Sequence, residues 1–326
     1  MGRRRDQLEL FTVPEPLRVG PAPASPALTA LAARLPAGVR FGTSSWGFPG
    51  WEGIVWDRPA TPAVLARHGL RAYAQHPLLR AVGLDRTYYA PIDADAFATM
   101  AAEVPDDFRL VVKAHELICM ARVPSHERHG ALRGQASPWF LDAAYTAREV
   151  VAPALAGLGA KLGVVVFQLP PQPAELLGGP VGFAARLRAF LRALPAGPCY
   201  AVELRTPQLL CDAYAAALAD TGAVHCLNVH PAMPDVPVQA ARVGTHGPLV
   251  VRWMLGRGFA YDAAVERYRP FDRLVDENPP VRRQVATLLR AAAAAGRAAY
   301  AVINNKAEGS APLTIRALAA ELAEPS

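Results

Sequence analysis

A lysine inside a β-rich run is the first residue of this sequence that could do chemistry. Lys113 is one of three lysines, so the other 31 of the 34 basic residues are arginines. A lysine kept in a chain that prefers arginine indicates a role that a guanidinium cannot fill. A buried amine can act as a base or a Schiff-base nucleophile, or it can offer a point charge to an anion. The structural alternative is an internal pair with Glu203.

Glu203 and Arg205 are the second candidate, because they lie two positions apart around the end of a β-rich run. Side chains two apart in a strand point to the same face. A carboxylate beside a cation stays ionised, which suits a general base or a metal ligand. An ion pair that only supports the fold is the alternative. Together with Asp85, which follows another β-rich run, Lys113 and Glu203 are the predicted catalytic residues.

Residues 304–310 have the composition of an anion-binding loop. They follow the last β-rich run, contain Lys306 and lead into a helical pattern at 313–322. Backbone N–H groups at a helix start, together with a lysine, can hold a phosphate or a carboxylate. Alternatively, Ser310 only caps the helix.

The histidines raise the question of a metal site. His115, His225 and His230 lie near strand ends, but no pair has the H-E-x-x-H spacing or a comparable one. A divalent metal held by Glu203, Asp85 and His230 stays an alternative, and no metal is predicted. The sequence contains no P-loop and no dinucleotide-binding loop placed after a strand, so we expect no organic redox cofactor.

Aromatic residues cluster after the first two β-rich runs. Their flat faces near a cationic site would suit a base or a sugar ring. Packing of a long first loop onto the fold is the alternative. The cluster contains Trp46, Trp51, Trp56, Tyr88 and Tyr89.

Eight β-rich runs alternate with helical patterns over about 285 residues. Such alternation produces a parallel sheet, and eight units close into a (β/α)₈ TIM-like barrel of the α/β class. An open doubly wound sheet is the rival. Helix starts are predicted at Ser137-Pro138 and Asn278-Pro279, whereas three prolines in 231–247 leave little room for the sixth helix. The predicted strands are 39–43, 80–84, 108–114, 163–168, 200–204, 224–229, 249–253 and 298–304.

In a barrel, ligands bind on the face built by the loops that follow the strands. Every predicted strand has a polar residue at or just past its C-terminal end, and these residues define the predicted site. The predicted ligand-binding residues are Ser44, Trp46, Arg86, Tyr88, Gln168, Arg205, Asn228, Arg252, Asn304, Asn305 and Lys306.

Residues 1–37 are rich in proline, alanine and arginine and show no sustained periodicity. We expect a disordered tail there and a single barrel domain over residues 38–326.

The strand ends also carry a set of recognisable motifs, in order over residues 40–322: Phe41-Gly42-Thr43-Ser44-Ser45-Trp46 with Pro49-Gly50-Trp51, Thr87-Tyr88-Tyr89, Val112-Lys113-Ala114, Phe167-Gln168-Leu169-Pro170-Pro171, Ala201-Val202-Glu203-Leu204-Arg205, and Asn304-Asn305 with Gly309 and Ala311. In these motifs the chain resembles the YecE-like family, known as domain of unknown function 72. The resemblance implies a TIM-like barrel and no established activity. Two positions depart from the family pattern: Gly83 stands where many members have an acidic residue, and Met254 stands where they have a histidine.

Composition excludes several classes of protein. Hydrophobic residues make up 52% and charged residues 19%, which excludes a largely disordered or fibrous chain. No apolar run approaches the ~20 residues of a membrane span, so we expect a cytoplasmic protein. The four cysteines form no C-x-x-C pair, and we expect reduced core thiols. The net charge of +6 comes from arginines spread along the chain rather than from one basic run.

The sequence therefore predicts a barrel enzyme, hydrolytic or lyase-like, that acts on a phosphorylated or nucleic-acid-like anionic ligand. Two alternatives stay open. One is a Schiff-base carbon-bond enzyme that uses Lys113, and the other is a non-catalytic nucleic-acid-binding protein. The oligomeric state is not predicted.

Overall fold

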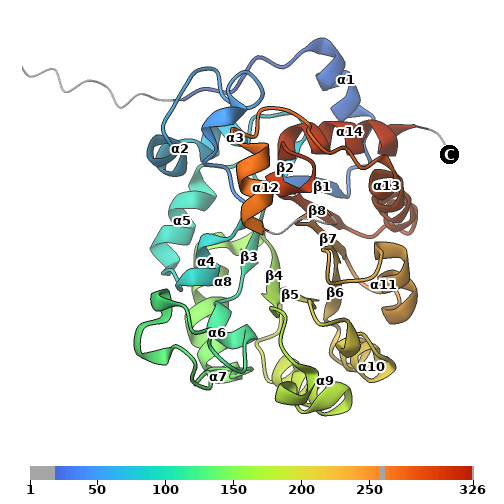
Figure 1. Ribbon diagram of the computed structural model, residues 1–326. Helices are drawn as coiled ribbons and strands as arrows, with labels where there is room; N and C mark the ends of the chain where they lie inside the picture. Colours follow the sequence, from blue (N-terminus) through green and yellow to red (C-terminus); the bar gives the residue numbers. More distant parts are fainter. Residues whose placement is uncertain (1–18, 257–260, 325–326) are drawn as a thin grey trace, which may run out of the picture.

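The eight predicted strands form a closed parallel barrel in the order β1 to β8 (Figure 1). The computed structural model describes residues 19–256 and 261–324. Neighbouring strands pair in parallel around the whole circle, including β1 with β8, so the barrel is confirmed and the open sheet is wrong. The strands are β1 Val39–Thr43, β2 Leu79–Leu84, β3 Arg109–Lys113, β4 Leu162–Gln168, β5 Cys199–Glu203, β6 Val224–Val229, β7 Leu249–Trp253 and β8 Ala299–Ile303.

Helices surround the barrel on the outside (Figure 1). Short 3-10 turns occur in the loops at Pro49–Trp51 (η1), Glu127–Leu132 (η2), Ala174–Leu177 (η5), Pro207–Leu209 (η6) and Asn305–Ala307 (η7). The helices are α1 Pro26–Ala33, α2 Pro62–His68, α3 Leu70–Tyr73, α4 Arg86–Tyr89, α5 Ala94–Ala102, α6 Glu116–Cys119, α7 Ala143–Thr146, α8 Ala152–Leu158, α9 Gly179–Arg192, α10 Asp212–Thr221, α11 Val236–Val243, α12 Tyr261–Tyr268, α13 Pro279–Ala294 and α14 Ala311–Ala323.

The two predicted helix starts have different outcomes. Helix α13 begins at Pro279 as expected, and the Asn278 side chain accepts a hydrogen bond from the Val281 N–H. The start predicted at Ser137 is wrong, because the helix begins at Ala143, where the Asp142 side chain accepts from the Tyr145 N–H. An aspartate at the N-cap position satisfies an otherwise unpaired backbone donor, and this local bond determines where the helix begins.

The sixth helix is present, although the prolines of 231–247 left little room for it. Helix α11 occupies Val236–Val243 with a proline in its first turn. Pro231 and Pro234 precede the helix and do not interrupt it. Proline is compatible with a first helical turn, because the N–H that it lacks has no partner there in any helix.

Secondary structure is present before the predicted boundary at residue 38. Residues 1–18 of the predicted tail lie outside the described residues, whereas α1 is a helix capped by the Ser25 side chain, and Leu31 on it is buried. The Gly20 N–H donates to the Asp57 carboxylate at 2.9 Å, and the Ala22 N–H donates to the Val55 carbonyl at 2.9 Å. These contacts attach residues 19–33 to the first loop of the barrel, which the proline-rich composition did not reveal.

The barrel interior is apolar below the C-terminal ends of the strands, that is, toward their N-terminal ends. Val111, Val164, Ala201, Val250 and Tyr300 belong to one buried cluster contributed by five different strands. A larger cluster contains the residues packed between barrel and helices. Side chains two apart in a strand share a face, so the next inward positions toward the C-terminal strand ends belong to the candidate site.

Candidate functional site

A layer of polar side chains follows the apolar cluster of the barrel interior, at the C-terminal ends of the strands. Lys113 follows Val111 by two positions on β3, and Gln168, Glu203 and Arg252 stand in the same relation to buried residues of β4, β5 and β7. All four side chains are buried. The closed barrel brings these four predicted residues together, although Lys113 and Arg252 are 139 positions apart in the sequence. The alternation of side chains along each strand turns all four to the same face.

Glu203 and Arg252 are the centre of a buried ion-pair network. The Arg252 guanidinium donates through Nη1 to Glu203 Oε2, and the Arg205 Nε donates to Glu203 Oε1 at 3.0 Å. The Gln168 Oε1 accepts from Arg205 Nη2 at 3.0 Å and from Arg252 Nη1 at 3.2 Å. Glu203 is 0% exposed, so solvent does not contact its carboxylate and these side chains surround it.

Lys113 and Asp85 occupy the more open part of the barrel mouth, which is the opening at the C-terminal ends of the strands. The Lys113 Nζ lies 3.7 Å from Asp85 Oδ1 and 3.8 Å from the centre of the Tyr88 ring. The Arg252 Nη2 donates to the same Asp85 oxygen at 3.3 Å. The Asp85 side chain is 30% exposed, whereas Lys113 as a residue is 9% exposed. Asp85 is therefore the carboxylate of the mouth that solvent or a ligand reaches directly.

Burial and charge shift the pKa values of the mouth in opposite directions. Burial lowers the pKa of Lys113 to about 8, against the attraction of Asp85. Burial also lowers the pKa of Lys306 to about 8, and Asp85 again opposes the shift. Burial would raise the pKa of Glu203, but the cations, Arg252 first, outweigh it and hold that pKa at about 2. Both lysines consequently exchange protons near neutral pH, while Glu203 stays ionised.

The mouth carries an excess of positive charge. Among the groups whose contacts are described, Lys113, Arg205 and Arg252 are three cations against the two carboxylates of Asp85 and Glu203, a formal net charge of +1 when Lys113 is protonated. Such an imbalance in a partly desolvated cleft favours an anion.

The start of α14 does not form the open anion cradle that the sequence predicted. The Asn305 Oδ1 accepts from the Ala311 N–H at 2.8 Å and from Trp51 Nε1 at 3.2 Å. Residues 275 and 276 donate their N–H groups to the Glu308 carbonyl, and Ser310 is 0% exposed. The chain itself therefore covers the helix N-terminus, because the segment after α12 packs over it. Ser310 occupies the N-cap position, but its side chain makes no cap hydrogen bond.

Two further predicted residues at strand ends bind neighbouring backbone groups. The Asn304 Oδ1 accepts from the Lys306 N–H at 3.0 Å. Asn228 is 0% exposed, and its Nδ2 donates to the Leu204 carbonyl at 2.9 Å. Both amides hold neighbouring backbone in place, so the structure assigns them to the support of the mouth.

The tryptophans of the first loop pack against the outside of the barrel. Trp46 Nε1 donates to the Leu65 carbonyl at 3.0 Å, and Trp56 Nε1 donates to the Phe48 carbonyl at 2.9 Å. Trp51 and Trp56 are fully buried. The packing alternative therefore accounts for the burial and the indole hydrogen bonds of these residues.

Tyr88, Tyr89, Arg86 and Ser44 complete the predicted set. Tyr88 is buried beneath the Lys113 amine, Tyr89 is exposed at the rim, and Arg86 is exposed on α4. The Ser44 hydroxyl lies 3.9 Å from the Met254 sulfur. Met254 thus fills with a thioether the position at which the family pattern has a histidine.

Gly83, the other departure from the family pattern, lies where little space is left. A Cβ at this position would lie 3.3 Å from Ser44 Cα and 3.3 Å from Val302 Cγ1. These contacts are tight, so an acidic side chain here would require its neighbours to move. The barrel mouth of this chain therefore depends on Asp85 and Glu203 for its negative charge.

Metal ligands do not gather in the described part of the chain. Within residues 19–256 and 261–324, no three histidine, cysteine, aspartate or glutamate side chains group as ligands. The His230 Nδ1 accepts from the Ala232 N–H at 3.2 Å, and burial lowers the pKa of His230 to about 4. The alternative that joined His230 to Glu203 and Asp85 as a metal site therefore finds no support in the geometry.

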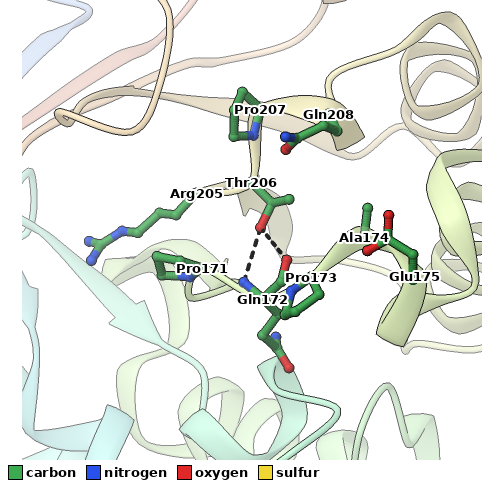
Figure 2. Close-up of a pocket in the computed structure, with 9 residues that line it drawn as sticks. All are labelled: Pro171, Gln172, Pro173, Ala174, Glu175, Arg205, Thr206, Pro207 and Gln208. Carbon is green, nitrogen blue, oxygen red and sulfur yellow. Dashed lines mark hydrogen bonds between the residues drawn. The ribbon is translucent and has the colours of Figure 1, made fainter.

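Sequence reasoning missed a groove beside the mouth, which Figure 2 shows. It lies between the loop that follows β4 and the loop that follows β5, with a volume of about 410 Å³. The sequence feature that could have indicated the groove is the presence of three prolines in the loops that follow two adjacent strands. The lining residues are Pro171, Gln172, Pro173, Ala174, Glu175, Arg205, Thr206, Pro207 and Gln208.

A protein-family model described as "Protein of unknown function DUF72" matches residues 40–326. The chain belongs to the DUF72 family. The resemblance inferred from the strand-end motifs is thereby confirmed, and the match covers the whole barrel. No curated protein matches the chain.

Crystal structures of two other DUF72 family proteins share the fold. One is from Enterococcus faecalis V583 and one from Thermotoga maritima MSB8, and each is 18% identical to this chain with a TM-score of 0.56. Both alignments cover 88% of this chain, and they cover 96% and 99% of the two relatives respectively. At this identity the likeness establishes the barrel architecture alone.

The last two features are the length and polarity of the helices and the state of the cysteines. Among the described helices, none combines the length and the apolar character that a bilayer crossing requires. All four cysteines are free thiols; Cys119 and Cys226 are buried, and Cys199 and Cys211 are half-buried.

Proposed function

We propose that the barrel mouth binds a small phosphorylated or otherwise anionic ligand and catalyses its hydrolysis or elimination. The observation that carries the proposal is the net positive mouth, in which the buried cations Lys113 and Arg252 both contact one partly exposed carboxylate, Asp85. Lys113 and Lys306 supply charge to the ligand, and Arg205 adds a guanidinium held in a fixed orientation by Glu203. Oriented donors of this kind bind anions with little loss of side-chain freedom.

Lys113 is the proposed acid/base residue. With a pKa of about 8, its amine holds a proton at neutral pH and can release it to a leaving oxygen atom. Asp85, 3.7 Å from the amine, is the base that can accept a proton from water or from the substrate. Glu203 is fully buried between two guanidinium groups, so its proposed role is to position Arg205 and Arg252.

Calorimetric titration with inorganic phosphate at pH 7 tests the proposal. Replacing Lys113 with Met keeps most of the side-chain stem and removes the charge, and the affinity should fall about ten- to hundredfold. Lys161→Met is the matched control, because Lys161 directly precedes β4, at the opposite end of the barrel, where its amine donates to the carbonyls of Ala101 and Val104 ahead of β3. The proposal fails if no anion binds the wild type and Lys113→Met unfolds the barrel, since Lys113 would then be structural.

A Schiff-base enzyme is the second candidate, and the Lys113 amine favours it. The amine is buried, its nearest carboxylate oxygen is 3.7 Å away, and a pKa of about 8 leaves part of it neutral at pH 7 to 8. Borohydride reduction in the presence of pyruvate, followed by peptide mass spectrometry, should then show an adduct on Lys113. No adduct on the wild type would eliminate this candidate.

Nucleic-acid binding without turnover is the third candidate, and salt dependence separates it from the first. Affinity for a single-stranded oligonucleotide that falls steeply with salt, with no cleavage and no binding of free phosphate, would replace the enzyme proposal.

A further inference from the structure

The groove of Figure 2 and the barrel mouth share one residue, Arg205. The Arg205 guanidinium binds Glu203 and Gln168 in the mouth, while the same residue lines the groove. A ligand held at Arg205 by an anionic group would therefore extend the rest of its structure along the groove.

Building on the proposed function, we propose that this groove binds the uncharged, hydroxyl-bearing part of a ligand whose single anionic group lies in the mouth, which makes the substrate a sugar monophosphate. The volume of about 410 Å³ falls within the range of small-molecule pockets. Ring C–H groups of a sugar fit the apolar faces of Pro171, Pro173 and Pro207, which are exposed on the groove walls.

The two walls of the groove are fixed to each other. The Thr206 hydroxyl donates to the Gln172 carbonyl at 3.0 Å and accepts from the Gln172 N–H at 3.2 Å (Figure 2). The Gln172 side chain turns away from the groove, where its Oε1 accepts from the Ala121 N–H at 2.7 Å. The groove is thus formed before any ligand arrives, which reduces the entropic cost of binding.

The charges at the two ends of the groove differ in sign. Figure 2 shows Arg205 at one end and Glu175 at the other. The exposed Glu175 carboxylate makes no hydrogen bond or ion pair with any described residue, so it is available to accept hydrogen bonds from ligand hydroxyls. The exposed Gln208 amide, on the loop that follows β5, offers both donors and acceptors.

Glu175 also disfavours other anionic ligands. A second phosphate at the far end of the ligand would meet its negative charge. A nucleic-acid strand carries one charge per nucleotide, so a strand continued along the groove would meet the same repulsion. The charge pattern therefore favours one anionic group per ligand over a bisphosphate or a polynucleotide.

Calorimetry with three probes tests the inference: inorganic phosphate, ribose 5-phosphate and ribose 1,5-bisphosphate. The wild type should bind ribose 5-phosphate about tenfold more tightly than phosphate, as expected from one or two additional hydrogen bonds. The bisphosphate should show no such gain. Ala174→Phe fills the groove and should abolish the gain for ribose 5-phosphate while phosphate binding is kept. Glu175→Gln should raise the affinity for the bisphosphate about tenfold, since the repulsion is gone.

The outcomes separate the groove from the mouth. Equal affinities for phosphate and ribose 5-phosphate, in the wild type and in Ala174→Phe, would overturn the groove assignment and leave the proposed function standing. Failure of the wild type to bind any of the three probes would overturn both. Glu52→Gln, an exposed glutamate in the first loop, is the control for the loss of one negative charge.

Discussion

The Arg252 guanidinium on β7 donates to the Glu203 carboxylate on β5, and β6 lies between the two strands. Arg252 is 2% exposed and Glu203 is 0% exposed. A buried charge costs several kcal/mol unless it is paired, so each of these residues requires the other. Because Arg252 also donates to Asp85, and Glu203 also accepts from Arg205, this one pair orients most of the charged groups of the mouth.

Replacing Glu203 with Gln should lower the free energy of unfolding by about 3 to 5 kcal/mol, because two guanidinium groups lose their carboxylate partner in a buried position. Urea unfolding followed by circular dichroism measures the change. Glu52→Gln, which removes an exposed carboxylate, should leave the unfolding free energy within about 0.5 kcal/mol of the wild type. A similarly small effect of Glu203→Gln would show that the network contributes little to stability.

Acid should weaken the fold through the same carboxylate. The pKa of Glu203 is about 2 in the folded protein, against an ordinary value of 4.5, so the folded state binds fewer protons than the unfolded state between these values. The stabilisation is complete above about pH 4.5 and is lost as the pH falls toward 2. Unfolding free energies of the wild type and Glu203→Gln, compared from pH 6 to pH 3, should converge as the pH falls. Parallel curves would contradict the assignment.

Anion binding should weaken as the pH rises through about 8. Lys113 and Lys306 both have a pKa of about 8, so both lose their charge there, whereas phosphate keeps its negative charge. Titration with inorganic phosphate at pH 7, 8 and 9 measures the effect, and the wild type should lose about tenfold or more in affinity over this range. Lys113→Met should bind more weakly at pH 7 and show a shallower pH dependence. An affinity that stays constant from pH 7 to pH 9 would exclude both lysines from the site.

Asn305 should affect stability without changing ligand affinity. Its side chain satisfies the Ala311 N–H and the Trp51 indole in a buried position, so Asn305→Ala leaves two donors unpaired. We expect a loss of about 1 to 3 kcal/mol in unfolding free energy. Phosphate affinity measured on the folded variant should match that of the wild type. A large loss of affinity at unchanged stability would instead return Asn305 to the binding site.

The barrel could be predicted because its signals are local and repeated. Eight β-rich runs with helical patterns between them require a parallel sheet, and eight such units close on themselves. Chain order likewise placed Lys113, Gln168, Glu203 and Arg252 at the C-terminal strand ends. The start of α7 was placed incorrectly at Ser137, since the deciding bond, which the Tyr145 N–H donates to Asp142 Oδ1, is one of several caps the sequence allows.

The sequence by itself determined which polar residues stand at the C-terminal ends of the strands, because chain direction and alternation follow from the order of residues. Tertiary structure alone decided which of them face an opening. Asn305 and Trp46 stand at strand ends as predicted, yet their side chains form hydrogen bonds with the backbone of Ala311 and Leu65, which belong to other segments. The groove between Pro171 and Gln208 exists only because two loops from adjacent strands lie side by side, held together by the Thr206 hydroxyl. Burial lowers the pKa of Lys113 for the same reason: the surrounding protein, assembled from distant segments, removes water from the amine.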